Sequence, residues 1–437
     1  MTRPGGTWRN WSRAVSVRPA RIEFPRTVDA VRRAVIAATR SGLGVKAVGA
    51  GHSFTAIAAA PGVLIDLRDL TGLVRVDHDR RRATLRGGTH LHEIPHLLGP
   101  HRLAMENLGD IDRQTISGAI STGTHGTGDR FGGLATQVVG VTMVTADGEL
   151  LVVDDEHNPE LLPAVALGLG ALGIIVEVTL QCVPAFVLHA LEAPEPLDDV
   201  VAALARRVEG ADHFEMYWFP HTDVALTKTN TRLPENAPRH PLPPVGRWID
   251  DVLVGTALHQ VACSVARAVP ATVPPINRLA ARLWGDREFT DASARVFATT
   301  RAVRFREMEY ALPAQDVPAA FAALRRVIDD GGWRISFPVE VRFAAADDIW
   351  LSTAHGRATG YIAVHRYARE DPTEYFAAVE EIMVRLGGRP HWGKMHTLDA
   401  ELLRRRYPRF DDFTALRDEL DPDRVFGNEY LSRVLGG

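Results

Sequence analysis

A glycine-rich turn that carries a histidine is the feature that most constrains the fold of this chain. The segment Val48-Gly49-Ala50-Gly51-His52-Ser53-Phe54 ends a short apolar run that begins at Val45, so it predicts a loop at the end of a strand. Glycines accept positive φ and have no Cβ, which lets backbone amides approach a phosphate closely. If that phosphate belongs to FAD, the imidazole of His52 can be the nucleophile that bonds the flavin ring. The structural alternative is a plain turn with an exposed histidine.

A second segment favours the phosphate hypothesis. Residues 115–128, TISGAISTGTHGTG, hold four glycines and six hydroxyl side chains in fourteen positions. Such a run suits a pyrophosphate bound by backbone N–H and hydroxyl groups. Neither segment opens a long helix with G-x-G-x-x-G, and the chain has no G-x-x-x-x-G-K-[ST]. The patterns therefore do not match the nicotinamide or nucleoside triphosphate fingerprints.

Six segments, taken in order, resemble one family. They are VGAGHSF at 48–54, STGTHGTG at 121–128, LGII at 172–175, EVR at 340–342, HWGK at 391–394 and DPDRVF at 421–426. The chain resembles the vanillyl-alcohol oxidase superfamily, whose FAD-binding domain is of the PCMH type. Within it, the chain is similar to the aldonolactone oxidoreductases, the L-gulono-1,4-lactone and D-arabinono-1,4-lactone oxidases or dehydrogenases, which are related to alditol oxidases.

The expected architecture has two domains. A length of 437 residues exceeds what one hydrophobic core usually supports. The resemblance implies an α+β fold, with a two-subdomain PCMH-type FAD-binding domain over residues 1–183. A substrate domain, with an antiparallel sheet covered by helices, is expected over 184–389. Residues 390–437, predicted as coil and short helices, are expected to return to the FAD-binding domain.

Apolar patterning predicts a capped helix from Thr27 to about Ser41 and a hairpin around Ala146-Asp147-Gly148. The hairpin strands are expected at Val138–Thr145 and Leu150–Val153, and other strands at Val45–Val48, Val63–Leu67, Val74–Val76, Ala83–Arg86, Ile174–Val183, Phe214–Phe219, Val224–Thr229, Val303–Tyr310, Ile335–Phe343 and Tyr361–Tyr367. Helices are expected at Leu91–Leu98, Val317–Ile328 and Pro372–Arg385. Five prolines within Arg232–Gly246 predict an exposed or poorly ordered loop.

The resemblance implies that FAD is attached covalently through His52, with His125 as the less favoured attachment site. The expected FAD contacts lie in the two glycine-rich segments, around Gly109, before the strand at 174 and in the HWGK segment. They are Val48, Gly49, Ala50, Gly51, His52, Ser53, Phe54, Asn107, Gly109, Asp110, Thr115, Ser117, Gly118, Ser121, Thr122, Thr124, His125, Gly126, Gly173, Ile174, Ile175 and Lys394.

A carboxylate and a guanidinium share one face of the expected strand at 335–343. Glu340 and Arg342 alternate with apolar residues there, so they could form a polar floor for a polyhydroxylated ligand. Pattern alone favours a solvated ion pair on a sheet surface. The resemblance instead places the Glu-x-Arg pair in the substrate site, away from the core, where it acts on turnover rather than folding.

Three further residues are expected to act in catalysis. Lys394 of HWGK would stabilise the negative charge that develops on hydride transfer. By its match to the family, His365 is a pocket wall with Tyr367 beside it, and Asp110 contacts a substrate hydroxyl. Alditol oxidases carry a small hydroxyl residue at the position of Tyr367, which favours a lactone ring over an open-chain polyol. No dedicated base is evident, and Arg342 and Lys394 could lower the pKa of the hydroxyl.

A histidine cluster invites a zinc hypothesis that we do not favour. His90, His92, His96 and His101 lie close together with Glu93 among them. The spacing is not a recognised ligand pattern, and on a helix the imidazoles would point in different directions. No metal is expected.

Composition restricts the partners. A net charge of −4 gives no basic field for nucleic acid. Cys182 and Cys263 lie in apolar runs and are expected to be buried thiols in the cytoplasm. The apolar stretch Val252–Val269 is interrupted by polar residues and is shorter than the ~20 residues of a spanning helix, so it predicts a surface or packed helix with peripheral membrane contact as an option.

The expected activity is FAD-dependent oxidation of a secondary hydroxyl of a sugar lactone. L-gulono-1,4-lactone is the leading substrate, followed by D-arabinono-1,4-lactone and L-galactono-1,4-lactone. Oxygen, a cytochrome or a dye would reoxidise the flavin, and Gly109 leaves room for oxygen. The alternatives are an alditol oxidase acting on xylitol or sorbitol and a carbohydrate-binding protein without redox activity, which the joint presence of His52, Glu340, Arg342 and Lys394 opposes.

Overall fold

The computed structural model describes residues 2–4, 6–243, 257–299 and 303–437. Its described strands form sheets of four, five and eight strands and two two-stranded sheets. The end of the predicted proline-rich loop and the start of the predicted apolar helix at 252 lie outside the described residues. Among the helices that are described, none combines the length and hydropathy needed to cross a bilayer.

The first sheet has four strands in the order β1-β4-β6-β5. They are β1 (Thr2–Pro4), β4 (Arg21–Glu23), β6 (Val63–Asp66) and β5 (Val45–Val48). β6 pairs in parallel with both β4 and β5. The helix α1 (Val28–Arg40) has the predicted cap, because the side chain of Thr27 accepts a hydrogen bond from Ala30 N–H.

The second sheet is antiparallel and has the order β11-β10-β12-β8-β7. Its strands are β11 (Leu150–Val153), β10 (Val138–Val144), β12 (Ile174–Gln181), β8 (Arg82–Arg86) and β7 (Leu73–Asp77). β10 and β11 form the predicted hairpin, and Gly148 in its turn has a φ of +83°. The buried face of α1 packs with residues of the first two sheets and with Val425 and Phe426.

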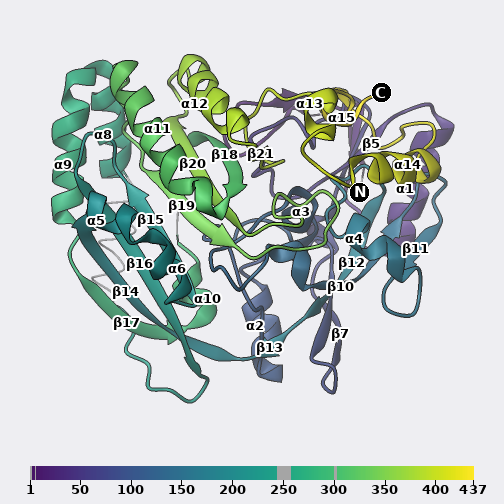
Figure 1. Cartoon of the computed structure of the whole chain (residues 1–437). Helices are drawn as coiled ribbons and strands as arrows, with labels where there is room; N and C mark the ends of the chain where they lie inside the picture. The colour runs from purple at the N-terminus through teal and green to yellow at the C-terminus, as the bar shows by residue number, and fades with distance from the viewer. Residues whose placement is uncertain (1, 5, 244–256, 300–302) are drawn as a thin grey trace.

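The third sheet is antiparallel, with eight strands in the order β17-β14-β16-β15-β19-β20-β18-β21. They are β17 (Arg287–Ala292), β14 (Phe186–Pro196), β16 (Val224–Pro234), β15 (His213–Trp218), β19 (Val339–Ala344), β20 (Thr359–Tyr367), β18 (Phe305–Pro313) and β21 (Arg389–Pro390). Helices that accompany this sheet are α5 (Leu197–Ala202), α6 (Leu204–Glu209), α8 (Ala257–Ala268), α9 (Val273–Leu283), α10 (Ser293–Phe297), α11 (Val317–Asp330) and α12 (Thr373–Arg385) (Figure 1).

The remaining elements are short. They are the strand pairs β2 (Trp8–Arg9) with β3 (Ser16–Val17) and β9 (Leu103–Ala104) with β13 (Val183–Pro184), and the helices α2 (Ile94–Leu98), α3 (Ile116–Thr122), α4 (Leu162–Val165), α13 (Ala400–Arg404), α14 (Phe410–Leu420) and α15 (Glu429–Leu435). Short 3-10 helices lie at Leu67–Asp69, Gly99–His101, Leu134–Gln137, Pro159–Leu161, Pro270–Thr272 and Ala314–Asp316.

The C-terminal segment lies against the first strands of the chain (Figure 1). Val45 N–H donates to Val425 O at 2.7 Å, and Phe54 N–H donates to Gly393 O at 2.6 Å. The side-chain amide of Asn428 donates to three carbonyls between Ala56 and Ala59. The loop after β5 is therefore held by residues more than 300 positions away.

Several expected elements have different bounds, and two of them begin clearly later than expected. The strand expected to begin at Ile335 begins at Val339, because Pro338 has no N–H for the ladder. The helix expected at Leu91–Leu98 covers only Ile94–Leu98.

Candidate active site

Two cavities adjoin at the loop that carries His52. The smaller, of about 100 Å³, lies between the end of β5 and the start of α3. The larger, of about 620 Å³, lies against the eight-stranded sheet. His52, Ser53, Gln114 and Thr122 line both of them. The site is therefore one elongated space with an imidazole at the junction.

The smaller cavity is a narrow cradle of glycines and hydroxyl side chains. A Cβ on Gly49 would lie 2.3 Å from Thr115 Oγ1, and one on Gly173 would lie 2.8 Å from Val144 O. Only glycine fits at these two positions. The predicted cofactor residues that line this cavity are Val48, Gly49, Ala50, Gly51, His52, Ser53, Thr115, Ser117, Gly118, Ser121, Thr122, Gly173 and Ile175.

One buried cation borders this cradle. Lys46 Nζ donates to Gly170 O at 2.8 Å and to Phe426 O at 3.1 Å. Burial lowers the pKa of Lys46 to about 7, although the carboxylate of Asp421 raises it. Lys46 thus joins β5 to the C-terminal segment behind the cradle.

Three predicted cofactor residues line neither cavity and lie behind the walls instead. The side-chain amide of Asn107 donates to Thr127 O at 3.2 Å. Gly126 O faces His125 Nδ1 at 2.9 Å, and Ile174 packs in the core beside α1. The sequence pattern placed them near the cofactor because their neighbours are there, but the side chains of Asn107 and Ile174 and the carbonyl of Gly126 support the wall.

The His52 ring is held by an aromatic side chain from the N-terminal segment. Trp11 stacks on it with ring centroids 5.6 Å apart, and Trp11 N–H donates to Gly51 O at 2.7 Å. Burial first, and then the positive charges of Lys394, His90 and Arg113, lower the pKa of His52 to about 4. His52 is therefore neutral near pH 7, which leaves a ring nitrogen with a free electron pair.

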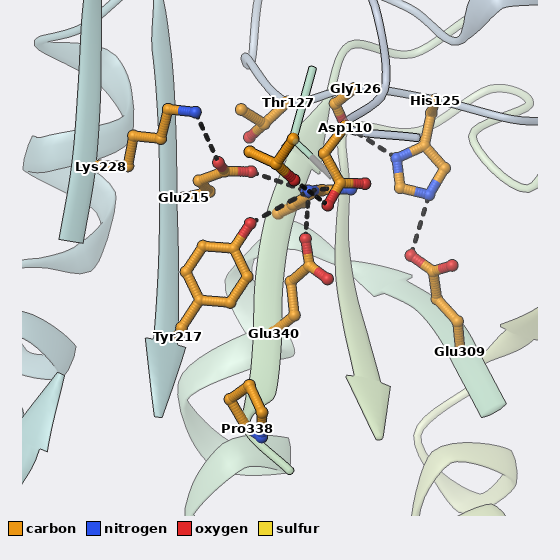
Figure 2. A network of polar contacts seen from close by, with 12 residues as sticks. Asp110, His125, Gly126, Thr127, Glu215, Tyr217, Lys228, Glu309, Pro338 and Glu340 are labelled. Atoms are coloured by element: carbon orange, nitrogen blue, oxygen red, sulfur yellow. Dashed lines mark hydrogen bonds and ion pairs between the residues drawn. The ribbon is translucent and has the colours of Figure 1, made fainter. Parts of the chain in front are cut away.

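A cluster of charged side chains surrounds Arg342 at the far side of the larger cavity; we call Asp110, Glu215, Tyr217, Glu340 and Arg342 the Arg342 cluster (Figure 2). Arg342 Nε donates to Glu215 Oε2 at 2.7 Å, and its Nη2 contacts Glu340, Asp110 and the Tyr217 hydroxyl. Burial would lower the pKa of Arg342, but the three carboxylates raise it well above its usual value. Lys228 lies 3.8 Å from the other oxygen of Glu215.

The surroundings of this cluster correct one expectation. Glu340 and Arg342 face the cavity as expected, but they are only 7 and 8% exposed rather than apart from the core. Both faces of β19 are buried, because helices and the returning segment cover the sheet. Their charges are therefore compensated inside the protein and contribute to folding as well as to any chemistry.

A second set of charged residues surrounds Lys394. Lys394 Nζ pairs with Glu307 and lies 4.0 Å from Glu309, both on β18. His365 Nε2 lies 3.6 Å from Glu307 Oε1, and its Nδ1 lies 2.9 Å from Pro338 O. Burial would lower the pKa of Lys394, but Glu307 and Glu309 raise it above its usual value, so the ammonium keeps its charge.

His125, Glu309 and His391 form a buried group whose ligand atoms lie within 4.8 Å of one another. His125 Nε2 is 3.0 Å from Glu309 Oε1 (Figure 2), and His391 Nδ1 accepts from Gly393 N–H at 3.0 Å. These contacts use the atoms that would bind a metal, so we interpret the group as hydrogen-bonded. The histidines at 90–101 are arranged differently: His92 Nδ1 faces Asp112 O and His101 packs against His78.

The residues expected beside the substrate divide into two sets. Asp110, Glu340, Arg342, His365 and Lys394 all line the larger cavity, as do Phe54, Gly109, Thr124 and His125. Tyr367 does not line it. Its ring packs with Phe54, Phe305 and Phe337, and its hydroxyl lies 3.5 Å from Ser264 Oγ. The argument from Tyr367 against an open-chain polyol therefore fails.

Sequence comparisons place these features in a known family. Residues 178–434 match the family model described as D-arabinono-1,4-lactone oxidase, and residues 19–154 match a model described as FAD binding domain. L-gulono-1,4-lactone dehydrogenase of Mycobacterium tuberculosis is 44% identical over 98% of this chain and 99% of its own length. This chain belongs to the aldonolactone oxidoreductases. It is thus an oxidoreductase with an FAD-binding domain, as the sequence motifs indicated.

More distant relatives agree with this aldonolactone oxidoreductase assignment. L-gulonolactone oxidase of Scyliorhinus torazame is 35% identical over 98% of both chains, and alditol oxidase of a Streptomyces species is 30% identical over 98% of this chain and 99% of its own length. Cholesterol oxidase of Brevibacterium sterolicum has a TM-score of 0.85 at 18% identity and covers 100% of this chain and 97% of its own. This likeness confirms the predicted fold, the PCMH-type FAD-binding fold with an antiparallel sheet and helices.

The cavities of this aldonolactone oxidoreductase fit FAD. The cradle offers backbone amides and hydroxyl side chains, and Gly49 and Gly173 let its backbone pack closely against Thr115 and Val144, which suits a pyrophosphate group. The larger cavity begins at the same His52 and is wide enough for a ring system beside a small substrate.

Sequence reasoning missed five residues of the site. They are Trp11, Glu215, Tyr217, Glu307 and Glu309, all of which line the larger cavity. Glu307 and Glu309 alternate with apolar residues on β18 as Glu340 and Arg342 do on β19, so the same alternation could have identified them. No local pattern marks Trp11 or Glu215.

Proposed function

We propose that this enzyme oxidises a secondary hydroxyl of a sugar 1,4-lactone by hydride transfer to FAD bound covalently through His52. L-gulono-1,4-lactone is the leading substrate, and D-arabinono-1,4-lactone and L-galactono-1,4-lactone are the next candidates. The observation that carries the proposal is a phosphate-type cradle that adjoins a larger cavity, with a neutral histidine where the two meet and two cations, Arg342 and Lys394, in the lining of the larger cavity. The names of the relatives support a sugar lactone as the substrate.

The two cations have distinct tasks in this proposal. Bound FAD would supply the hydride acceptor. Arg342 and Lys394 orient the substrate oxygen and stabilise the negative charge that develops on it, which also lowers the pKa of the hydroxyl. Glu215 Oε2 holds Arg342 by accepting from its Nε at 2.7 Å. Glu307 holds Lys394 through a direct ion pair. Asp110, Glu340 and His365 contact the sugar hydroxyls from the same walls.

The covalent attachment uses the neutral ring of His52. Bound FAD would supply the isoalloxazine methyl carbon to which a ring nitrogen of His52 bonds. One hydrogen would leave the imidazole and one the methyl group, and the electron pair would pass to the flavin and then to the electron acceptor. The low pKa of His52 supports this assignment, because a protonated imidazole has no electron pair to donate. His125 is less suited, since both of its ring nitrogens face hydrogen-bond partners.

We further propose the domain division 1–183, 184–389 and 390–437, with the last segment contacting the FAD-binding domain. The first two sheets fall before residue 184, and contacts such as Val45 to Val425 support the return. Two free, buried cysteines support a cytoplasmic location. Oxygen is the acceptor we favour, because Gly109 lines the larger cavity without a side chain.

An alditol oxidase acting on xylitol or sorbitol is the second candidate. A relative of that name is 30% identical over nearly the whole chain, and Tyr367 lies outside the cavity wall, where it cannot exclude an open-chain substrate.

Two measurements test the proposal. A visible spectrum of the purified protein before and after acid precipitation should show flavin that stays in the pellet. Turnover with a panel of aldonolactones and alditols should show higher kcat/KM for a lactone. Acid-released flavin would reject the covalent linkage, and higher kcat/KM for xylitol would assign the enzyme to alditols.

A further inference from the structure

Exposed apolar side chains gather on α8 and α9, two consecutive α-helices that accompany the eight-stranded sheet. Ten large apolar side chains are more than a third exposed in the part of the chain that the structure describes, and five lie between residues 261 and 283. These five, which we call the apolar ridge, are Val261, Val265, Val269, Leu279 and Leu283, with exposed fractions of 44–61%. A surface helix normally turns such residues inward.

The ridge follows helical spacing on both helices. Val261 and Val265 lie one turn apart on α8, Val269 comes directly after its end, and Leu279 and Leu283 lie one turn apart on α9. Cys263 and Ala266 on α8, and Ala281 on α9, are buried on the opposite faces. Each helix is thus apolar on both sides. Both lie at the edge of the molecule away from the C-terminal helices (Figure 1).

The charged side chains within the segment that carries the ridge are all of one sign. Residues 257–283 contain three arginines and no acidic residue, whereas the whole chain has 54 acidic and 50 basic residues. Arg267, Arg278 and Arg282 are all exposed. Apolar side chains next to guanidinium groups match the interface of a bilayer that contains anionic lipids. A second copy of the chain would bring like charges together, which opposes a symmetric dimer through this surface.

We propose that the apolar ridge docks this enzyme on the surface of an anionic lipid bilayer, with the valines and leucines in the interface and the arginines on lipid headgroups. Leu279 and Leu283 also line the larger cavity, so docking brings one border of that cavity to the membrane surface. The proposal does not depend on which sugar is the substrate.

Vesicle flotation of the full-length enzyme tests this. Vesicles of phosphatidylcholine alone are compared with vesicles that also contain phosphatidylglycerol, at low and high ionic strength. We expect roughly tenfold more protein to float with the anionic vesicles, and high salt to reduce the difference. The double variant Val261→Glu/Val265→Glu should lose most of this binding and keep its turnover in solution, because neither residue lines a cavity. Arg278→Gln/Arg282→Gln should weaken it.

The matched control is Leu150→Glu/Leu402→Glu, which puts the same charge at two leucines of 43 and 40% exposure elsewhere on the surface. It should float as the wild type does. Equal flotation of the ridge and control variants, or no flotation of the wild type, would overturn the proposal. Concentration-dependent dimers in sedimentation velocity that Val261→Glu/Val265→Glu abolishes would also overturn it, because a second copy would then cover the ridge.

Discussion

The loop at 48–54 and the Arg342 cluster lie on the two sides of one cavity, but they are built in opposite ways. The loop comes from seven consecutive residues after one strand. The Arg342 cluster takes side chains from β15, from β19 and from the loop at Asp110, which are over 100 residues apart in sequence. A motif search can find the first, whereas only the paired strands of the large sheet produce the second.

The difference extends to energetics. Phosphate-type loops bind with backbone amides, so substitution of one side chain leaves most of the binding groups in place. In the Arg342 cluster, three carboxylates contact one guanidinium inside the protein, with Lys228 near only Glu215, and removal of Arg342 leaves buried charge uncompensated. Variants of the loop should therefore change cofactor retention, and variants of the cluster should change turnover and stability together.

The largest effect is expected at Arg342. Arg342→Gln should lower kcat/KM by a factor that corresponds to about 2–4 kcal/mol and destabilise the fold by roughly 3–5 kcal/mol. Steady-state kinetics with an aldonolactone and denaturant unfolding measure the two quantities. Arg342→Lys is the control, because it keeps the charge and should recover most of the stability but not the bidentate geometry. Wild-type stability in Arg342→Gln would show that the cluster is not a structural unit.

The same comparison explains what the sequence could predict. The helix cap at Thr27, the hairpin at 138–153 and the loop at His52 were predicted because each depends on neighbouring residues. The burial of Glu340 was not predicted, because the alternation of polar and apolar residues shows which side chains share a face of the strand but not what covers that face. Asn107 and Tyr367 were expected at the site but lie behind its walls for the same reason: a strand or loop pattern does not say which side chain ends at a cavity and which packs behind it.

At the loop, His52→Ala should leave a folded protein whose flavin is fully released by acid. The backbone cradle stays intact, so noncovalent flavin should still bind. In-gel flavin fluorescence and the spectrum of the acid supernatant are the measurements. Acid-stable flavin in this variant would show that another residue carries the flavin, and His125 would be the first candidate.

Acid should destabilise both regions through buried histidines. Burial lowers the pKa of His213 and His391, and of His52 before flavin is attached to it, to about 4, against about 6.5 in the unfolded chain. Between these pH values the histidines are protonated in the unfolded state but not in the native state. The free energy of unfolding therefore falls as the pH drops from about 6.5 to about 4. Each histidine contributes up to roughly 1.4 kcal/mol per pH unit in that range. Unfolding curves at several pH values should show this slope, and a flat profile would contradict these pKa shifts.

A smaller effect is expected from Trp11, which joins the N-terminal segment to the loop. Trp11→Leu should slow covalent flavin attachment several-fold, because the His52 ring loses the face on which it stacks. Trp11→Phe keeps an aromatic ring and should be close to wild type. The fraction of acid-stable flavin over time after mixing apoprotein with FAD measures this. Equal rates in the two variants would show that the stacking does not position His52.

The smallest expected effect is on reoxidation of the flavin and concerns Gly109. A Cβ there would lie 3.0 Å from His125 O and 3.5 Å from Thr124 Cγ2, so an alanine methyl is tight but needs only a small shift. Because Gly109 lines the larger cavity and adjoins Asp110 of the Arg342 cluster, the methyl would take space open to oxygen without removing a polar contact. Gly109→Ala should therefore slow reoxidation of the reduced enzyme in air and leave lactone-dependent flavin reduction nearly unchanged. Stopped-flow measurements of both half-reactions separate the two effects. Equal, slow reoxidation in both proteins would show that Gly109 does not control oxygen access and that the enzyme works as a dehydrogenase.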